Sequence, residues 1–165
     1  MSVKGYTLNQ WSMVLLATLI MAMIGGVTSG SIMDRIGRKP ALIGGCILLS
    51  LCLVVLGFAR GALLPLAAVV TGFFTSFTYT WIVVYVPEIF PTERRGACMG
   101  WATTVARISY VVGPALSAVL LDAYPTMDGF WVAAALIVLV PIGIILAVNP
   151  YETRTQELEE IAVRR

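Results

Sequence analysis

The sequence predicts an all-α integral membrane protein with five transmembrane helices, and three observations lead to this fold class. The 165 residues are 59% hydrophobic and 12% charged, with a mean hydropathy of +0.90. This composition leaves too little polar surface to cover a soluble globule of this size. The apolar residues gather in five stretches, each near the roughly 20 residues that cross a hydrocarbon layer as a helix. Short connectors containing glycine and proline separate them.

Each apolar stretch must be helical, because a backbone N–H or C=O group left unpaired in lipid costs several kcal/mol. We therefore expect a membrane domain over residues 1–150. The remaining residues, 151–165, are too polar to enter lipid and should form a short cytoplasmic helix. The expected transmembrane helices are 11–33, 41–59, 62–86, 97–121 and 130–148. The second and fifth are almost purely aliphatic, so lipid-facing positions at the periphery are expected for them.

Basic residues are distributed unevenly over the connectors. The first connector, the third connector and the tail carry most of them, whereas the opposite side carries only Lys4 and Arg60. The positive-inside rule places the base-rich connectors and the C-terminus in the cytoplasm and the N-terminus outside. A multi-pass protein of the plasma membrane is expected. The bases on the cytoplasmic side are Arg35, Arg38, Lys39, Arg94, Arg95, Arg154, Arg164 and Arg165.

Several classes of function are excluded by the residues present. The chain has no histidine, and its three cysteines lie within apolar runs at spacings that suit no metal. No pair of carboxylates lies within the apolar stretches, so neither catalytic residues nor enzymatic activity is expected. A net charge of +2 without a basic run does not suggest nucleic acid. Neither a cofactor nor a metal is expected.

Arg107 is the one base inside an apolar stretch. It lies about ten residues into its predicted helix, roughly 15 Å deep and close to the bilayer midplane. A charge at that depth costs at least ~2.5 kcal/mol, so it normally faces a cavity or a partner. The five stretches contain no acid at the same depth. The counter-ion is therefore a helix terminus, an acid on an absent segment, or a substrate carboxylate, whose geometry suits a guanidinium.

A possible solute lining lies in the third stretch, where "FFTSFTYTW" interleaves hydroxyl and aromatic side chains. Tyr79 and Trp81 fall well inside the predicted helix and are expected to bind substrate together with Arg107. Tyr110 lies one turn from Arg107 and is expected to share its cavity. Hydroxyls that bond to their own helix and rings packed in a bundle would produce the same pattern.

Three charged segments carry a resemblance to a known family. "GSIMDRIGRK" (30–39) resembles the G-x-x-x-D-R-x-G-R-K/R loop of the major facilitator superfamily, and "PEIFPTERRGACMG" (87–100) resembles its P-E-x-[FY]-P-T-x-x-R-[AG]-x-x-x-G segment. "ETRTQELEEI" (152–161) is similar to the E-T-[KR]-x-x-x-L-E-E-I tail of sugar porters. The resemblance implies helices eight to twelve of a carrier, a partial six-helix half-bundle. The seventh helix and the whole first half would be its missing partners.

The resemblance also implies that the charged loops form a network that latches the two halves of a carrier together and breaks when the cytoplasmic side opens. Such partly buried pairs bias two states by a few kcal/mol at most. A static network that only orders the loops is the alternative. Gly30 is expected to allow close helix packing and Gly37 to adopt a positive φ. The positions that match are Gly30, Asp34, Arg35, Gly37, Arg38, Glu88, Pro91, Arg95 and Glu152, with Arg94 an additional base.

The function implied is that of the C-terminal part of a secondary active transporter working by alternating access. "GWATTVARISYVVGP" (100–114) resembles the eleventh helix of organic-anion carriers, which implies an organic anion as solute and a proton as its symported partner. A sugar porter is one alternative, favoured by the tail, although "YVPEIFPT" replaces the G-P-x-x-P-W pattern of sugar porters. A truncated, non-transporting membrane subunit or fragment is the other.

Overall fold

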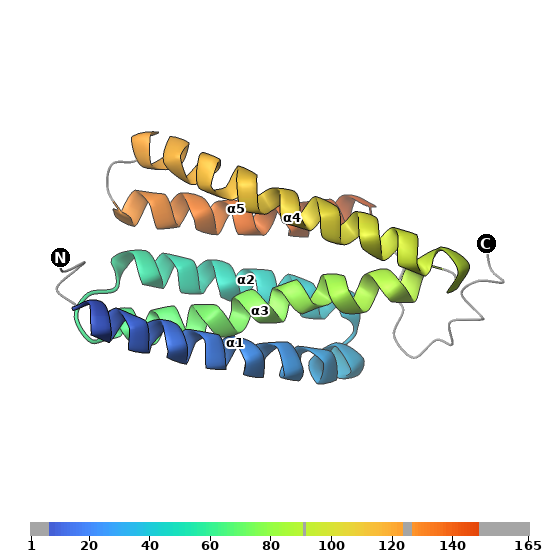
Figure 1. Cartoon of the computed structure of the whole chain (residues 1–165), viewed down its shortest axis with the longest axis horizontal. Helices are drawn as coiled ribbons and strands as arrows, with labels where there is room; N and C mark the ends of the chain where they lie inside the picture. The colour runs from blue at the N-terminus through green and yellow to red at the C-terminus, as the bar shows by residue number, and fades with distance from the viewer. Residues whose placement is uncertain (1–6, 91, 124–126, 149–165) are drawn as a thin grey trace.

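The computed structural model describes residues 7–90, 92–123 and 127–148, and this part of the chain is entirely helical apart from its connecting residues. All five helices are long and apolar enough to cross a membrane, which confirms the predicted all-α membrane fold. The expected tail helix lies outside the described residues. The helices are α1 (Leu8–Ile36), α2 (Arg38–Phe58), α3 (Leu63–Ile89), α4 (Thr92–Ala123) and α5 (Met127–Val148) (Figure 1).

The junction of α1 and α2 is shorter than the sequence suggested. We expected a connector from the end of the first apolar stretch to Pro40, but Gly37 is the single non-helical residue between the two helices. Its φ of 112° confirms the positive φ expected there. Asp34 and Arg35 belong to the last turn of α1, where a base also complements the helix dipole. The helix continues because its backbone hydrogen bonds do not require apolar side chains.

The junction of α3 and α4 is also shorter than expected. α3 continues through Pro87 to Ile89, and α4 begins at Thr92 instead of near residue 97. Pro87 removes only the hydrogen bond to the carbonyl of Val83, which is a small loss so close to a helix end. Both junctions lie at the same end of the bundle, at the right in Figure 1.

The core of the described residues surrounds α2. α1 packs mainly on α3, and α2 packs on both α5 and α3, whereas α4 lies at the edge of the bundle (Figure 1). The expectation that the second stretch is peripheral was therefore wrong, because α2 contributes ten buried residues. α4 contributes none. The buried clusters are Met33, Ala41 and Phe77; Leu42, Cys46 and Ile145; Leu49, Leu53 and Ala135; and Leu56, Ala59, Leu64 and Ala67.

Small residues set the crossing of α1 and α3. A Cβ added at Gly25 would clash with the backbone of Phe73, and one added at Gly72 would clash with Thr18. Gly30, where we expected such close packing, does not take part. A Cβ there would meet no atom within 4 Å. The crossing point lies nearer the middle of α1, so Gly30 lies beyond the closest approach of the two helices.

Candidate functional site

Three helices converge on the guanidinium of Arg38, the first residue of α2. Its Nε and Nη2 donate to Oε2 and Oε1 of Glu88 on α3, at 2.9 and 2.5 Å. Its Nη1 lies 2.9 Å from Oδ1 of Asp34 on α1 and donates to the carbonyl of Met33 at 3.1 Å. We call Asp34, Arg38 and Glu88 the Arg38 cluster. The structure thus brings together three residues that the sequence predicted for the charge network.

The two carboxylates of the Arg38 cluster lie in different environments. The Arg38 residue is only 8% exposed, and the side chains of Glu88 and Asp34 are 22% and 67% exposed. The fork-to-fork geometry with Glu88 is the stronger type of carboxylate contact, because two parallel hydrogen bonds share the charge. The Asp34 pair is open to water, and such pairs contribute only about 0–1 kcal/mol. Glu88 is therefore the principal partner of Arg38.

Arg38 is also held through its backbone. The indole Nε1 of Trp81 donates to the Arg38 carbonyl oxygen at 3.1 Å. The Trp81 ring stacks on Tyr85, with ring centroids 4.4 Å apart and planes 21° from parallel. Neither Tyr85 nor this role of Trp81 was predicted from the sequence. The i, i+4, i+7 spacing of Trp81, Tyr85 and Glu88 on one helix face was the available signal.

The other residues predicted for the network lie in several places. Arg35 is exposed at the end of α1. Arg95, in the first turns of α4, has buried Nε and Nη2 atoms with no hydrogen-bond partner among the described residues. A buried donor without a partner costs about 1–3 kcal/mol. Pro91 and Glu152 lie outside the described residues. Asp34, Arg38 and Glu88 are thus brought together, whereas no ion pair joins Arg95 to them among the described residues.

Arg107 occupies the middle of α4. It lies 15 positions after Thr92 and 16 before Ala123, roughly 22–24 Å from either end of the helix. Its side chain is exposed, and no hydrogen bond or ion pair joins it to another of the described residues. The ion pairs within the described ranges lie at the two ends of the bundle, at Arg38 and at Arg60. Arg107 is therefore a cation at mid-helix without an acid beside it in this part of the chain.

The aromatic residues predicted to bind solute divide into two groups. Tyr79 and Tyr110 are 51% and 73% exposed and offer their rings outward from α3 and α4. Trp81 instead packs against two buried clusters, those of Met33 and of Leu42. We therefore do not assign Trp81 to a solute site. The hydroxyls of Thr75, Thr78 and Thr80 donate to carbonyls of their own helix at 2.8–2.9 Å, as the alternative interpretation of this stretch expected.

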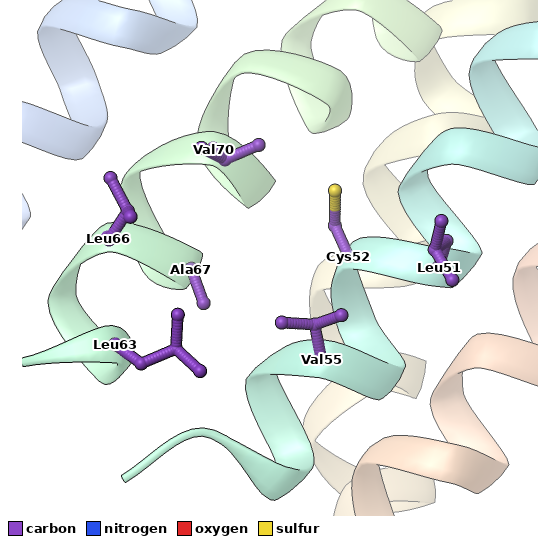
Figure 2. A pocket seen from close by; sticks show the side chains of 7 residues that line it. All are labelled: Leu51, Cys52, Val55, Leu63, Leu66, Ala67 and Val70. Carbon is purple, nitrogen blue, oxygen red and sulfur yellow. The ribbon is translucent and has the colours of Figure 1, made fainter. Parts of the chain in front are cut away.

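A groove of about 210 Å³ lies between α2 and α3 (Figure 2). It is near the end of the bundle opposite the Arg38 cluster, close to the turn at Arg60 and Gly61. No charged or hydroxyl side chain lines it, so it offers nothing that would bind an anion or a sugar. The lining residues are Leu51, Cys52, Val55, Leu63, Leu66, Ala67 and Val70.

Comparisons with known proteins support a transporter. The chain is 33% identical over 138 residues to YdjK of Escherichia coli (strain K12), provisionally named as a metabolite transport protein. It is 31% identical over 123 residues to the gentisate transporter of Corynebacterium glutamicum. It is 30% identical over 140 residues to the glucose transporter GlcP of Staphylococcus epidermidis. These alignments cover 80%, 73% and 79% of this chain but only 29%, 28% and 31% of the relatives, so the chain spans less than a third of their length.

The family assignment rests on nearly the whole chain. The family model of the Major Facilitator Superfamily matches residues 2–164. Its members are transporters of small solutes, not enzymes, and the relatives described above are named for metabolites, gentisate and glucose. The five apolar helices make this chain a multi-pass membrane protein. The chain belongs to the Major Facilitator Superfamily.

Proposed function

We propose that the chain forms helices eight to twelve of a secondary active transporter that moves a small organic anion by alternating access, coupled to protons. The observation that carries the proposal is Arg107, a cation at mid-helix with no acid beside it among the described residues. Such a charge is costly in lipid and belongs in a cavity or against a partner. The gentisate transporter among the relatives supports an organic acid as that partner.

The solute site is built from Arg107 and the exposed aromatic residues. The guanidinium binds a carboxylate through two parallel hydrogen bonds. Tyr79 lies ten positions before the end of α3, roughly 15 Å from the Arg38 end, and Arg107 lies roughly 22 Å from it. Tyr79 therefore lies about 7 Å nearer the Arg38 end than Arg107, and Tyr110, one turn beyond Arg107, lies about 5 Å farther from that end. Between them they offer the mixed apolar and polar lining typical of small-molecule sites.

The Arg38 cluster acts as part of the latch between the two halves of the carrier. The buried nitrogen atoms of Arg95 await an acceptor from the absent first half. The open space beside Gly30 leaves room for an element of that half. Arg35 extends the positive surface. Pro91 and Glu152 complete the network, as their motifs imply.

The Arg38 end of the bundle faces the cytoplasm of a plasma membrane, with the N-terminus outside. The working carrier also requires the seventh helix and the first half, which would form the other wall of the cavity. No acid lies at the depth of Arg107 in the part of the chain that the structure describes. We place the proton-carrying group on the seventh helix or the first half.

Two other functions have some support. A sugar porter is favoured by the likeness to the glucose transporter GlcP and by the "ETRTQELEEI" tail. A non-transporting subunit is favoured by the edge position of α4, none of whose residues is buried in the described chain.

Uptake by a hybrid carrier tests these functions. The chain replaces the matching C-terminal segment of the gentisate transporter, and uptake of labelled gentisate and glucose is measured in proteoliposomes. We expect gentisate uptake, and we expect Arg107→Gln to raise the KM at least tenfold. Arg60→Gln is the matched control, because Arg60 lies at the end of the bundle opposite the Arg38 cluster. This variant should leave the KM for gentisate unchanged.

Each other outcome selects a different function. An Arg107→Gln variant with an unchanged KM would rule out direct contact between Arg107 and the anion. Uptake of glucose alone would support a sugar porter. A folded hybrid that transports neither solute, while the parent carrier is active, would support a non-transporting subunit.

A further inference from the structure

One face of α3 holds the start of α2 at two points. Trp81 bonds the backbone carbonyl of Arg38 at 3.1 Å, and Glu88 bonds the side chain of the same residue at 2.5 and 2.9 Å. The two contacts are seven positions apart, roughly 10 Å along the helix axis. Tyr85 lies between them, buried and stacked on Trp81.

The position of Trp81 is itself restricted. Its ring packs against the Met33 cluster, formed by α1, α2 and α3, and against the Leu42 cluster, formed by α2 and α5. Tyr85 covers the ring from the Arg38 end. The indole therefore has little freedom to turn away from the Arg38 carbonyl unless α2 and α3 separate. Whether its N–H can bond the Arg38 carbonyl therefore depends on the distance between α2 and α3.

We propose that Trp81 is a positioning residue for the Arg38–Glu88 ion pair. The backbone hydrogen bond fixes where α2 begins, and this places the guanidinium in line with the Glu88 carboxylate. A rotation or shift of α3 at the depth of Tyr79, two residues before Trp81, displaces both contacts together. In a carrier this links occupancy of the solute site to the state of the latch, a step that rests on the proposed function.

Trypsin cleavage of the full chain in lipid nanodiscs tests the contact without requiring transport. Arg38 is buried and Arg35, one turn away, is exposed, so the ratio of cleavage after Arg38 to cleavage after Arg35 measures local opening. Trp81→Phe keeps an aromatic ring for Tyr85 and removes the N–H together with the five-membered part of the indole. Loss of one hydrogen bond should raise this ratio about fivefold, because cleavage follows the population of the open form. Trp101→Phe, at an exposed position of α4, is the matched control.

Two results would overturn the positioning role. One is an unchanged cleavage ratio in Trp81→Phe. The other is an equal rise at Arg35 and Arg38, which would indicate general loosening of the bundle. A double variant, Trp81→Phe with Glu88→Gln, should raise the ratio by less than the product of the single effects, because both residues act on Arg38.

Transport by the hybrid carrier gives a second readout. We expect Trp81→Phe to lower kcat for gentisate uptake and to leave KM unchanged. A raised KM with unchanged kcat would instead place Trp81 in contact with the solute and overturn the inference. If the unsubstituted hybrid transports nothing, the proposed function fails, and the cleavage ratio still decides whether Trp81 positions Arg38.

Discussion

Replacing Glu88 by glutamine removes the more buried of the two negative charges that Arg38 faces while nearly preserving side-chain volume. The Glu88 contact has two hydrogen bonds and partly buried partners, with the Glu88 side chain 22% exposed. Exposed ion pairs contribute about 0–1 kcal/mol, whereas breaking a fully buried pair costs about 3–5 kcal/mol. Because the Arg38–Glu88 pair is only partly buried, the cost of breaking it should lie between these two values. Glu88→Gln should lower the free energy of unfolding by about 2–3 kcal/mol.

Asp34→Asn is the matched control for this prediction. Asp34 bonds the same guanidinium but its side chain is 67% exposed, so its loss should cost at most about 1 kcal/mol after solvent screening. For a chain of this size 1 kcal/mol shifts Tm by about 2–4 °C. We therefore expect Tm decreases of about 4–12 °C for Glu88→Gln and at most about 4 °C for Asp34→Asn.

The assay is thermal unfolding of the purified chain in detergent or nanodiscs, followed by circular dichroism at low and high salt. High salt should reduce the small Asp34 effect further and leave most of the Glu88 effect, because partly buried pairs are screened less. A larger decrease for Asp34→Asn than for Glu88→Gln would refute the assignment of Glu88 as principal partner. So would a Glu88→Gln variant with the Tm of the unsubstituted chain.

Two further predictions use the same measurement. Gly25→Ala should destabilise the bundle by several kcal/mol, because the new methyl group meets the Phe73 backbone. Gly30→Ala meets open space and should be neutral or stabilising by up to about 1 kcal/mol; equal effects at the two glycines would contradict the proposed helix crossing. Arg38→Met should cost about 3 kcal/mol or more, because it strands two carboxylates and a carbonyl. Arg95→Met should leave Tm unchanged or raise it, because buried donors without partners are removed; a decrease as large as that of Arg38→Met would show that Arg95 is already paired.

The helix ends and the Arg38 cluster show where sequence reasoning lost detail. The apolar runs predicted each helix but missed the charged turns at the Arg38 end of the bundle, since Asp34 and Glu88 are charged yet helical. The motifs at 30–39 and 87–100 brought Arg38 and both acids into one network. They did not show which acid is the stronger partner of Arg38, because the burial of Glu88 depends on how α3 lies against α2. Gly30 makes no close approach to another described helix, because its spacing shows that a helix can approach closely but not where the approach occurs.

The sequence by itself determined that five helices cross a membrane, because a lipid environment requires continuous apolar runs and internally paired backbones, which are local properties. It also determined the positive φ at Gly37. The position of Arg107 along its helix was predicted less closely, because α4 begins at Thr92 instead of near residue 97. Only the tertiary structure decided which faces are buried. α2 is almost wholly aliphatic, so its sequence does not show which of its faces is buried. Its central position in the bundle comes from contacts with α3 and α5. The bond between Trp81 and Arg38 joins residues 43 positions apart, and such pairings depend on helix packing that no local pattern records.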